Sequence, residues 1–334
     1  MRRSVVVTLV AVAVAAVVAA SLTLWLRSRG SSSSAAPPTQ SSATCPTLGA
    51  DHTLGAVRGV PLQSSIFDSR LCASLVGAEQ GGAPDPSSAS YPAFLASLRD
   101  RVLKSYVFDV VVAQEARVHH VEASQQQVDG EIQTDVTNAG GQDKLESQLA
   151  AAGGSISALQ DETRSRLNET NLVDELARER AADVVARLQA GMAFDQAAKQ
   201  FSDDPGTRDV GGALGAVTLD QLNAGDPTLK AAILQMKPGE LTTTPVRDSQ
   251  GYEIVFLSAA DATSRTLHVI RISAPNPYTT KERPDWFSEF IFLDIQGDCS
   301  QSALTLTERG LGSPCSSASP SPVPSPAATP TPTH

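Results

Sequence analysis

The sequence contains few aromatic residues and no run of basic residues. Aromatic side chains make up 4% of the 334 residues, and the formal net charge is -10. A surface that binds nucleic acid needs a basic face, so this charge argues against nucleic acid as a partner. No CxxC pair occurs, and His119-His120 has no cysteine nearby, so we interpret these histidines as solvated polar residues. We expect neither a metal nor a cofactor.

A long uncharged apolar run, Ser4 to Leu26, lies near the N-terminus. It is long enough to cross a bilayer as one helix, and Trp25 lies at its end, where interfacial aromatics are common. The run is longer than the apolar core of a usual signal peptide. This favours an uncleaved transmembrane anchor over residues 1–29, with a cleaved signal as the alternative.

The remaining low-complexity segments flank the part of the chain that we expect to fold. Residues 30–49 are rich in Ser, Pro and Ala and are interpreted as a linker. Residues 316–334 contain little besides Ser, Pro, Ala and Thr, and we predict that this tail is disordered.

Four cysteines outside any metal-binding pattern are typical of an oxidising, exported compartment. The simplest pairing by sequence proximity joins Cys45 to Cys72 and Cys299 to Cys315, although three connectivities are possible. Together with the apolar run, the cysteines predict a single-pass protein of the cell membrane with most of the chain extracytoplasmic.

Residues 50–175 carry mostly helical patterns. His52–Val60 is predicted to be a short strand with a turn at Arg58-Gly59. Tyr91–Val118 has apolar residues three and four positions apart, which predicts a long helix. Ser124 and Gln127 form a capping box that starts another helix, and Gly140-Gly141 ends it. A last helix is expected to begin at Ser157 and run toward Leu188.

Residues 176–274 read as a small α+β domain with an antiparallel sheet. The Gly/Asp/Pro-rich composition of Ser202–Gly215 predicts a loop that turns repeatedly. The other predicted elements are, in order, helices at Ala193–Phe201 and Pro227–Met236 and strands at Leu241–Val246, Tyr252–Leu257 and Ser264–Ala274.

Within this domain, the words FSDDPGT, GGALG, MKPGE and GYEIVFL occur in an order that resembles the parvulin (PpiC-type) family of peptidyl-prolyl isomerases, or rotamases. The helical region before it resembles the chaperone domain of the SurA and PrsA foldases, through RGVPL, QEA and the segment Glu122–Ile132. The resemblance implies an α+β chain with a SurA-like chaperone domain at 50–175 and a parvulin-like, FKBP-like domain at 176–274. A C-terminal extension with a cysteine pair follows at 275–315.

The resemblance also implies a site. The Cys/Asp position that follows the family's FSD word falls on Asp204, and its last-strand histidine position falls on Glu253. The apolar proline pocket is implied at Phe201, Leu214, Leu222 and Leu229, where Leu222 stands for a methionine and Leu229 for a phenylalanine. Read without the family, Asp203 and Asp204 are simply turn residues after a helix.

The family's first strand, which carries another histidine, is missing before the first helix of this domain. We hypothesise that Leu267–Ile272 takes its place as an antiparallel neighbour of Tyr252–Leu257. His268 would then join Asp204 and Glu253 in a catalytic cluster. The alternative is that His268 is an ordinary strand residue.

These features imply a membrane-anchored peptidyl-prolyl isomerase that assists the folding of exported polypeptides containing X–Pro bonds. Isomerisation has a barrier near ~20 kcal/mol, so a catalyst need only favour the twisted amide. Because Glu253 replaces a family histidine, a catalytically inactive holdase chaperone is one alternative. A third is an envelope scaffold in which the apolar cluster Trp286–Leu293 forms an interface.

Overall fold

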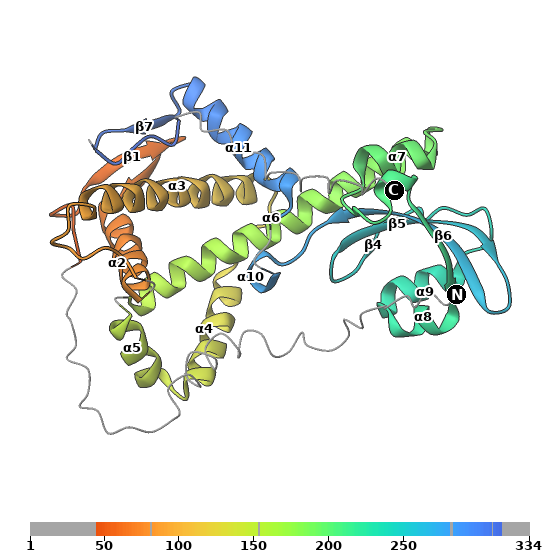
Figure 1. Ribbon diagram of the computed structural model, residues 1–334, viewed down its shortest axis with the longest axis horizontal. Helices are drawn as coiled ribbons and strands as arrows, with labels where there is room; N and C mark the ends of the chain where they lie inside the picture. Colours follow the sequence, from red (N-terminus) through yellow and green to blue (C-terminus); the bar gives the residue numbers. More distant parts are fainter. Residues whose placement is uncertain (1–44, 81, 153, 281–282, 309, 316–334) are drawn as a thin grey trace, which may run out of the picture. The chain divides into compact units, whose positions relative to one another are not determined.

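The computed structural model describes residues 45–80, 82–152, 154–280, 283–308 and 310–315 (Figure 1). The predicted membrane anchor and the Pro/Ser tail lie outside these residues. In the described part of the chain, no helix is both long and apolar enough to span a membrane. The described chain divides into two compact units, one formed by Val111–Ile291 and the other by Pro46–Val110 together with the residues from Phe292 onward.

The second of these units contains a three-stranded antiparallel sheet of order β2-β1-β7. The predicted strand with a turn is a hairpin of β1 (Thr53–Val57) and β2 (Val60–Gln63), and β7 (Leu304–Leu306) pairs with the other edge of β1. Arg58 and Gly59 both have positive φ, as a tight hairpin turn requires. Helix α2 (Ser64–Gln80) follows the hairpin.

All four cysteines are oxidised. Cys299 and Cys315 form the predicted disulfide, with their Cα atoms 5.6 Å apart. Cys45 and Cys72 are also disulfide-bonded, and no cysteine in the described residues is free. This state agrees with the oxidising compartment that the sequence indicates.

Four further helices follow α2 in the described part of the predicted helical region. Helix α3 (Tyr91–Val118) has the predicted bounds, and α4 (Gln125–Ala139) begins at the predicted capping box of Ser124 and Gln127 and ends at Gly140. Helix α5 (Gln142–Ala151) follows. Helix α6 (Ile156–Gln189) is capped by the Ser155 hydroxyl and continues without a break into the region of the second sheet.

The second sheet has four antiparallel strands in the order β3-β6-β5-β4. Strand β6 is the long central strand that pairs with both β5 and β3, so the predicted position of the 264–274 strand beside 252–257 is confirmed. The helices and strands that follow α6 are, in chain order, α7 (Phe194–Phe201), η1 (Arg208–Val210), β3 (Ala213–Thr218), α8 (Leu219–Ala224), α9 (Pro227–Gln235), β4 (Val246–Arg247), β5 (Gly251–Ala260), β6 (Ser264–Ser273), α10 (Pro277–Thr280) and α11 (Asp285–Ser300).

The predicted strand Leu241–Val246 is largely wrong as a regular strand. Strand β4 comprises only Val246 and Arg247, and Leu241 forms one isolated bridge to Phe256. Pro245 lies between these two points and has no backbone N–H to give to a ladder, which interrupts the pairing.

Helices cover both faces of this sheet, and alternation along β5 and β6 assigns side chains to one face or the other. Helices α8 and α9 lie against one face, which we call the α8/α9 face, and α6 and α7 contact the other, which we call the α6/α7 face (Figure 1). Glu253 and Val255 project to the α8/α9 face, whereas Ile254 and Phe256 project to the α6/α7 face.

Candidate functional site

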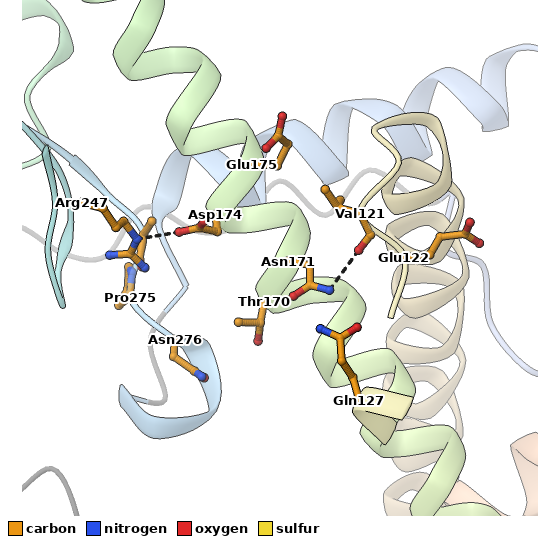
Figure 2. Close-up of a pocket in the computed structure, with 11 residues that line it drawn as sticks. Val121, Glu122, Gln127, Thr170, Asn171, Asp174, Glu175, Arg247, Pro275 and Asn276 are labelled. Atoms are coloured by element: carbon orange, nitrogen blue, oxygen red, sulfur yellow. Dashed lines mark hydrogen bonds and ion pairs between the residues drawn. The ribbon is translucent and has the colours of Figure 1, made fainter. Parts of the chain in front are cut away.

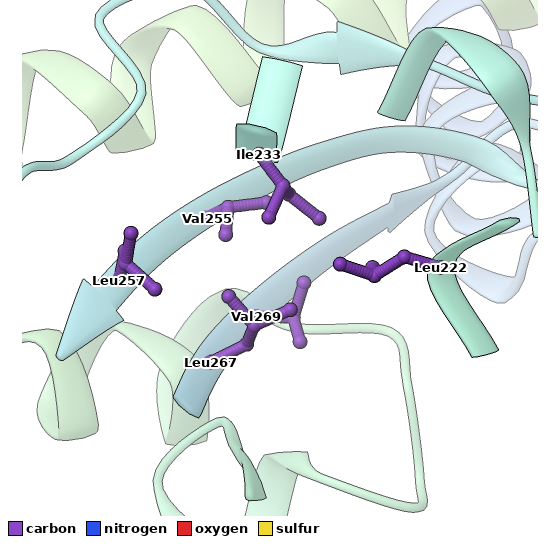
Figure 3. Packing of buried hydrophobic residues seen from close by; sticks show 6 residues of the cluster. All are labelled: Leu222, Ile233, Val255, Leu257, Leu267 and Val269. Atoms are coloured by element: carbon purple, nitrogen blue, oxygen red, sulfur yellow. The ribbon is translucent and has the colours of Figure 1, made fainter. Parts of the chain in front are cut away.

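An apolar cluster forms the floor of the α8/α9 face (Figure 3). Leu222 comes from α8 and Ile233 from α9, and Val255, Leu257, Leu267 and Val269 come from the two central strands. Val217, Leu219, Leu229 and Met236 are only partly buried and form the margin of the cluster. We call this cluster and its margin the apolar surface; the partly buried margin is the part that a small ring such as the side chain of proline can reach.

Local capping fixes the two short helices that carry this surface. The Thr218 hydroxyl and the Gln221 side chain form a capping box at the start of α8. Asp226 caps α9, because its Oδ1 accepts hydrogen bonds from the N–H groups of Thr228 (2.8 Å) and Leu229 (3.0 Å). These caps accept hydrogen bonds from backbone N–H groups that have no partner within the helix. Without them the ends of these helices, which are too short to be stable in isolation, would fray.

A charged pair extends the apolar surface along the same face of the sheet. Glu253 lies opposite Arg271 in the antiparallel register, directly beyond the pair of Val255 and Val269. The Arg271 Nε donates a hydrogen bond to Glu253 Oε1 at 2.5 Å. The Glu253 side chain is 1% exposed and that of Arg271 is 34% exposed, so the guanidinium covers the carboxyl group.

The environment of Glu253 favours its protonated form. Burial raises the pKa of Glu253 to about 7, against the lowering effect of Arg271 and with a smaller raising effect from the carboxylates of Asp248 and Asp204. Glu253 Oε2 is buried and has no hydrogen-bond partner among the described residues. The carboxyl group therefore changes charge near neutral pH, next to the apolar surface.

The loop after α7 lies against β6 beside this pair, along the part of the β6 edge that the start of β3 does not reach. The Asp203 N–H donates to the Arg271 carbonyl (2.8 Å), and the Arg271 N–H donates to Ser202 Oγ (3.2 Å). The Ser273 N–H donates to Asp203 Oδ2 at 2.8 Å. The backbone of Arg271 is thus held by hydrogen bonds on the loop side as well as by its pairing with β5.

Asp204 has a structural role in this loop. Its Oδ1 accepts a hydrogen bond from the Gly206 N–H (3.0 Å) and its Oδ2 accepts one from the Thr207 hydroxyl (2.6 Å). This is the turn role that the sequence alone suggests. Its negative charge also contributes to raising the pKa values of Arg271 and Glu253. The structure therefore brings Asp204 and Glu253 into one electrostatic cluster, although a catalytic role for Asp204 stays a prediction.

His268 does not join Glu253, and this part of the hypothesis is wrong. His268 lies opposite Phe256 on the α6/α7 face, where its ring contacts the rings of Phe194 and Phe256 at centroid distances of 6.0 and 5.9 Å. Residues three positions apart in a strand point to opposite faces, so His268 and Arg271 cannot both face Glu253. Arg271 occupies the position that the hypothesis gave to His268.

The four predicted pocket residues divide into two groups. Leu222 and Leu229 belong to the apolar surface. Leu214 is 51% exposed on β3, and Phe201 lies beneath the Arg187 guanidinium, 5.4 Å from its ring centroid; neither is a member of that cluster. Sequence reasoning missed Arg271, although the alternation in its strand carries the signal, because Val269 and Leu267, two and four residues before it, are apolar.

A separate polar cavity of about 590 Å³ lies between α6, the start of α4 and the ends of β4 and β6 (Figure 2). Asp174 accepts hydrogen bonds from Arg247 Nε (2.7 Å) and from the Tyr252 hydroxyl (3.0 Å), and Asn171 Nδ2 donates to the Val121 carbonyl (3.0 Å). The other carboxylates of its lining are also paired, Glu175 with Arg178 and Glu122 with Arg117. These contacts join the elements around the cavity, and we assign it no chemistry.

Comparison with known proteins finds a family domain that covers most of α6 and the chain as far as β5. Residues 159–259 match the family model described as Rotamase, PPIC-type PPIASE domain. This match ends before β6, so it does not include Arg271.

Two of the similar proteins are a chaperone and a foldase. The chain is 36% identical over 96 residues to the chaperone SurA of Sodalis glossinidius, which is 28% of this chain and 21% of that protein. It is 37% identical over 75 residues to the foldase protein PrsA 1 of Lactobacillus johnsonii, which is 22% of this chain and 25% of that protein. The chain therefore spans only about a fifth to a quarter of the length of these relatives.

Among solved structures, the foldase protein PrsA of Streptococcus pneumoniae matches 78% of this chain and 97% of its own, with 13% sequence identity and a TM-score of 0.27. A likeness at this level has no bearing on function.

Proposed function

Because the chain carries a PPIC-type parvulin rotamase domain that is distantly homologous to the SurA and PrsA foldases, we propose that it catalyses cis–trans isomerisation of X–Pro bonds in exported polypeptides. The observation that carries this proposal is the arrangement on the α8/α9 face. A partly open apolar surface adjoins a polar cluster of Glu253, Arg271 and Asp204.

The proposed reaction needs only this arrangement. The proline ring packs on Leu222 and Leu229, while the X–Pro amide lies over the polar cluster. The barrier of about 20 kcal/mol arises from the loss of amide resonance as the bond twists. Groups that interact better with the twisted amide than with the planar one lower this barrier. Asp204 and Glu253 are the residues that we propose for this polar side.

NMR exchange spectroscopy on the full chain with a panel of short X–Pro peptides tests the proposal. We expect cis–trans exchange above the thermal rate. Asp204→Ala removes the charge and both turn acceptors, whereas Asp204→Asn removes the charge but keeps one acceptor oxygen for the turn, so a rate lost in both variants, with the fold intact, assigns a catalytic role to that carboxylate. A wild-type chain that leaves the exchange at the thermal rate would reject isomerase activity.

A holdase chaperone is the second candidate, and two observations favour it. Glu253 stands at the position of a family histidine, and His268 faces the other side of the sheet. Such a protein would bind unfolded clients on the apolar surface without accelerating isomerisation. Suppressed aggregation of a denatured client protein, lost in Leu229→Asp but unaccompanied by exchange above the thermal rate, would support this reading.

We further propose that the protein acts outside the cytoplasm and is held at the membrane by the apolar run Ser4–Leu26. The two disulfides support an oxidising compartment, and the homologous foldases suggest unfolded exported polypeptides as partners. Protease treatment of intact cells tests this location. Full protection of the chain, or its recovery in the soluble fraction after lysis, would contradict it.

A further inference from the structure

Arg271 has hydrogen-bond donors that the protein does not use. Its Nε donates to Glu253 and its backbone N–H donates to Ser202 Oγ. Neither of its Nη groups donates to any group in the described residues, and the side chain is 34% exposed. A guanidinium with unused donors therefore lies beside the buried Glu253, on the face of the sheet that carries the apolar surface.

We propose that Arg271 is a catalytic residue that donates a hydrogen bond to the prolyl nitrogen of the twisted X–Pro amide. This inference deepens the proposed isomerase function and rests on it. It assigns to Arg271 a role that sequence reasoning gave to histidine and carboxylate side chains.

The chemistry of the amide favours a donor at this position. In the planar amide the nitrogen lone pair is delocalised into the carbonyl group and accepts hydrogen bonds poorly. As the bond twists, the lone pair returns to the nitrogen, which becomes a hydrogen-bond acceptor. A donor aimed at this nitrogen interacts with the twisted state more strongly than with either planar isomer, so it lowers the barrier in both directions. No proton is transferred and no covalent bond forms.

The surroundings of Arg271 keep it charged and oriented. Partial burial favours its neutral form, but the Glu253 carboxylate, with smaller contributions from Asp204 and Asp248, raises the pKa of Arg271 above its ordinary value. The carboxyl groups that act on Arg271 are those of Glu253, opposite it on β5, of Asp204 in the loop after α7, and of Asp248 in the turn before β5. Glu253 is therefore a positioning residue, and Arg271 is the group that contacts the substrate.

The test compares four full-length variants in the NMR exchange assay, with an X–Pro peptide that has no titratable group between pH 5.5 and 8.5. Arg271→Met removes the donor, Arg271→Lys keeps the charge but loses the planar fork, and Glu253→Gln removes the positioning charge. Arg265→Met, near the other end of β6, is the matched control because its Nη1 donates to the carbonyls of Asp261 and Ser264. Peptide affinity is measured in parallel by chemical-shift titration, and folding by the methyl spectrum.

We expect Arg271→Met to lower the catalysed exchange rate about 100-fold, with peptide affinity changed less than about threefold because ground-state contacts remain. Arg271→Lys should retain an intermediate rate, and Arg265→Met should behave as the wild type. The wild-type rate should fall as the pH drops through the titration of Glu253, and this inflection should disappear in Glu253→Gln.

Three results would overturn the inference. A folded Arg271→Met variant with the wild-type exchange rate would remove Arg271 from catalysis while leaving the isomerase function intact. A wild-type chain without any acceleration would reject the isomerase function and this role together. An equal loss of rate in Arg271→Met and Arg265→Met would assign the effect to the strand rather than to the donor.

Discussion

The two faces of the four-stranded sheet are built from the same two strands but differ in what they can do. On the α8/α9 face, β5 and β6 present an apolar surface that ends in the Glu253–Arg271 pair. On the α6/α7 face, the same strands present fully buried Ile254 and Ile270 and a half-buried His268 against aromatic rings. One face thus combines an open margin with charge, whereas the other is closed packing.

This difference shows that a residue type suited to catalysis does not identify a site. His268 has the chemistry expected of the family's site, yet its position in the register directs it to the closed face. Arg271 lies three residues further along and reaches the open face.

The largest effect concerns the buried carboxyl group. Because the pKa of Glu253 is raised to about 7 in the folded protein, its contribution to stability is fully present below the unfolded pKa and is lost as the pH rises through about 7. The rise from the ordinary pKa of 4.5 corresponds to a loss on the order of 3 kcal/mol. Glu253→Gln should remove this pH dependence.

Urea unfolding at pH 5 and pH 8, followed by the fluorescence of Trp286 in a Trp25→Phe background, measures this effect. Glu289→Gln, which replaces an exposed carboxylate on α11, is the control and should keep the wild-type pH dependence. Equal pH dependence in the wild type and in Glu253→Gln would show that Glu253 does not titrate in this range.

The second prediction concerns Gly212, which lies between β6 and the side chains of α7. It has φ +81°, and a Cβ atom there would lie 2.8 Å from the Val269 carbonyl oxygen and 2.9 Å from a ring carbon of Phe194. Gly239→Ala is the matched control, because Gly239 has φ +90° with nothing within 4 Å. We expect Gly212→Ala to cost about 2 kcal/mol more than Gly239→Ala in urea unfolding. Equal costs would mean that backbone strain, not crowding, determines both.

The third prediction tests the margin of the apolar surface. Leu229→Ala should weaken binding of X–Pro peptides about fivefold, because it removes roughly 1 kcal/mol of apolar contact with the proline ring. Leu234→Ala on the same helix is the control, since Leu234 is 43% exposed and is not a member of the cluster. Chemical-shift titration measures both affinities. A larger loss in Leu234→Ala would move the binding surface to the outer side of α9.

The smallest effect is expected at His268. Replacing it with phenylalanine keeps the aromatic contacts with Phe194 and Phe256, so stability should change by less than about 1 kcal/mol. The exchange rate should stay within about twofold of the wild type. A loss of exchange activity comparable to that of Arg271→Met would place a functional group on the α6/α7 face and contradict the assignment of the site to the α8/α9 face.

Local signals explain which elements the sequence could predict. The bounds of α3, the capping box at Ser124 and the position of β6 follow from periodicity, side-chain capping and strand alternation. These signals act over a few residues and need no knowledge of the tertiary arrangement.

The site was only partly predictable from the sequence, because it depends on how the helices pack on each face of the sheet and on which side chains they leave partly exposed. Alternation separates His268 from Arg271, but only the placement of α8 and α9 shows which of them adjoins the apolar surface. Leu214 and Phe201 were expected in that surface because of their positions in the family's sequence motifs. In the structure Leu214 is exposed on β3, and Phe201 packs under Arg187. Family words fix sequence positions, whereas side-chain direction depends on the register and on the bulge in β3.

The most direct test of isomerase activity on the α8/α9 face is methyl-detected NMR of the full chain during titration with an X–Pro peptide, combined with exchange spectroscopy of the peptide itself. We predict cis–trans exchange above the thermal rate, with shifts concentrated in the methyl groups of Leu222, Leu229, Val255 and Val269 on the α8/α9 face. Shifts confined to Ile254 and Ile270 on the closed face, or binding without any accelerated exchange, would contradict it.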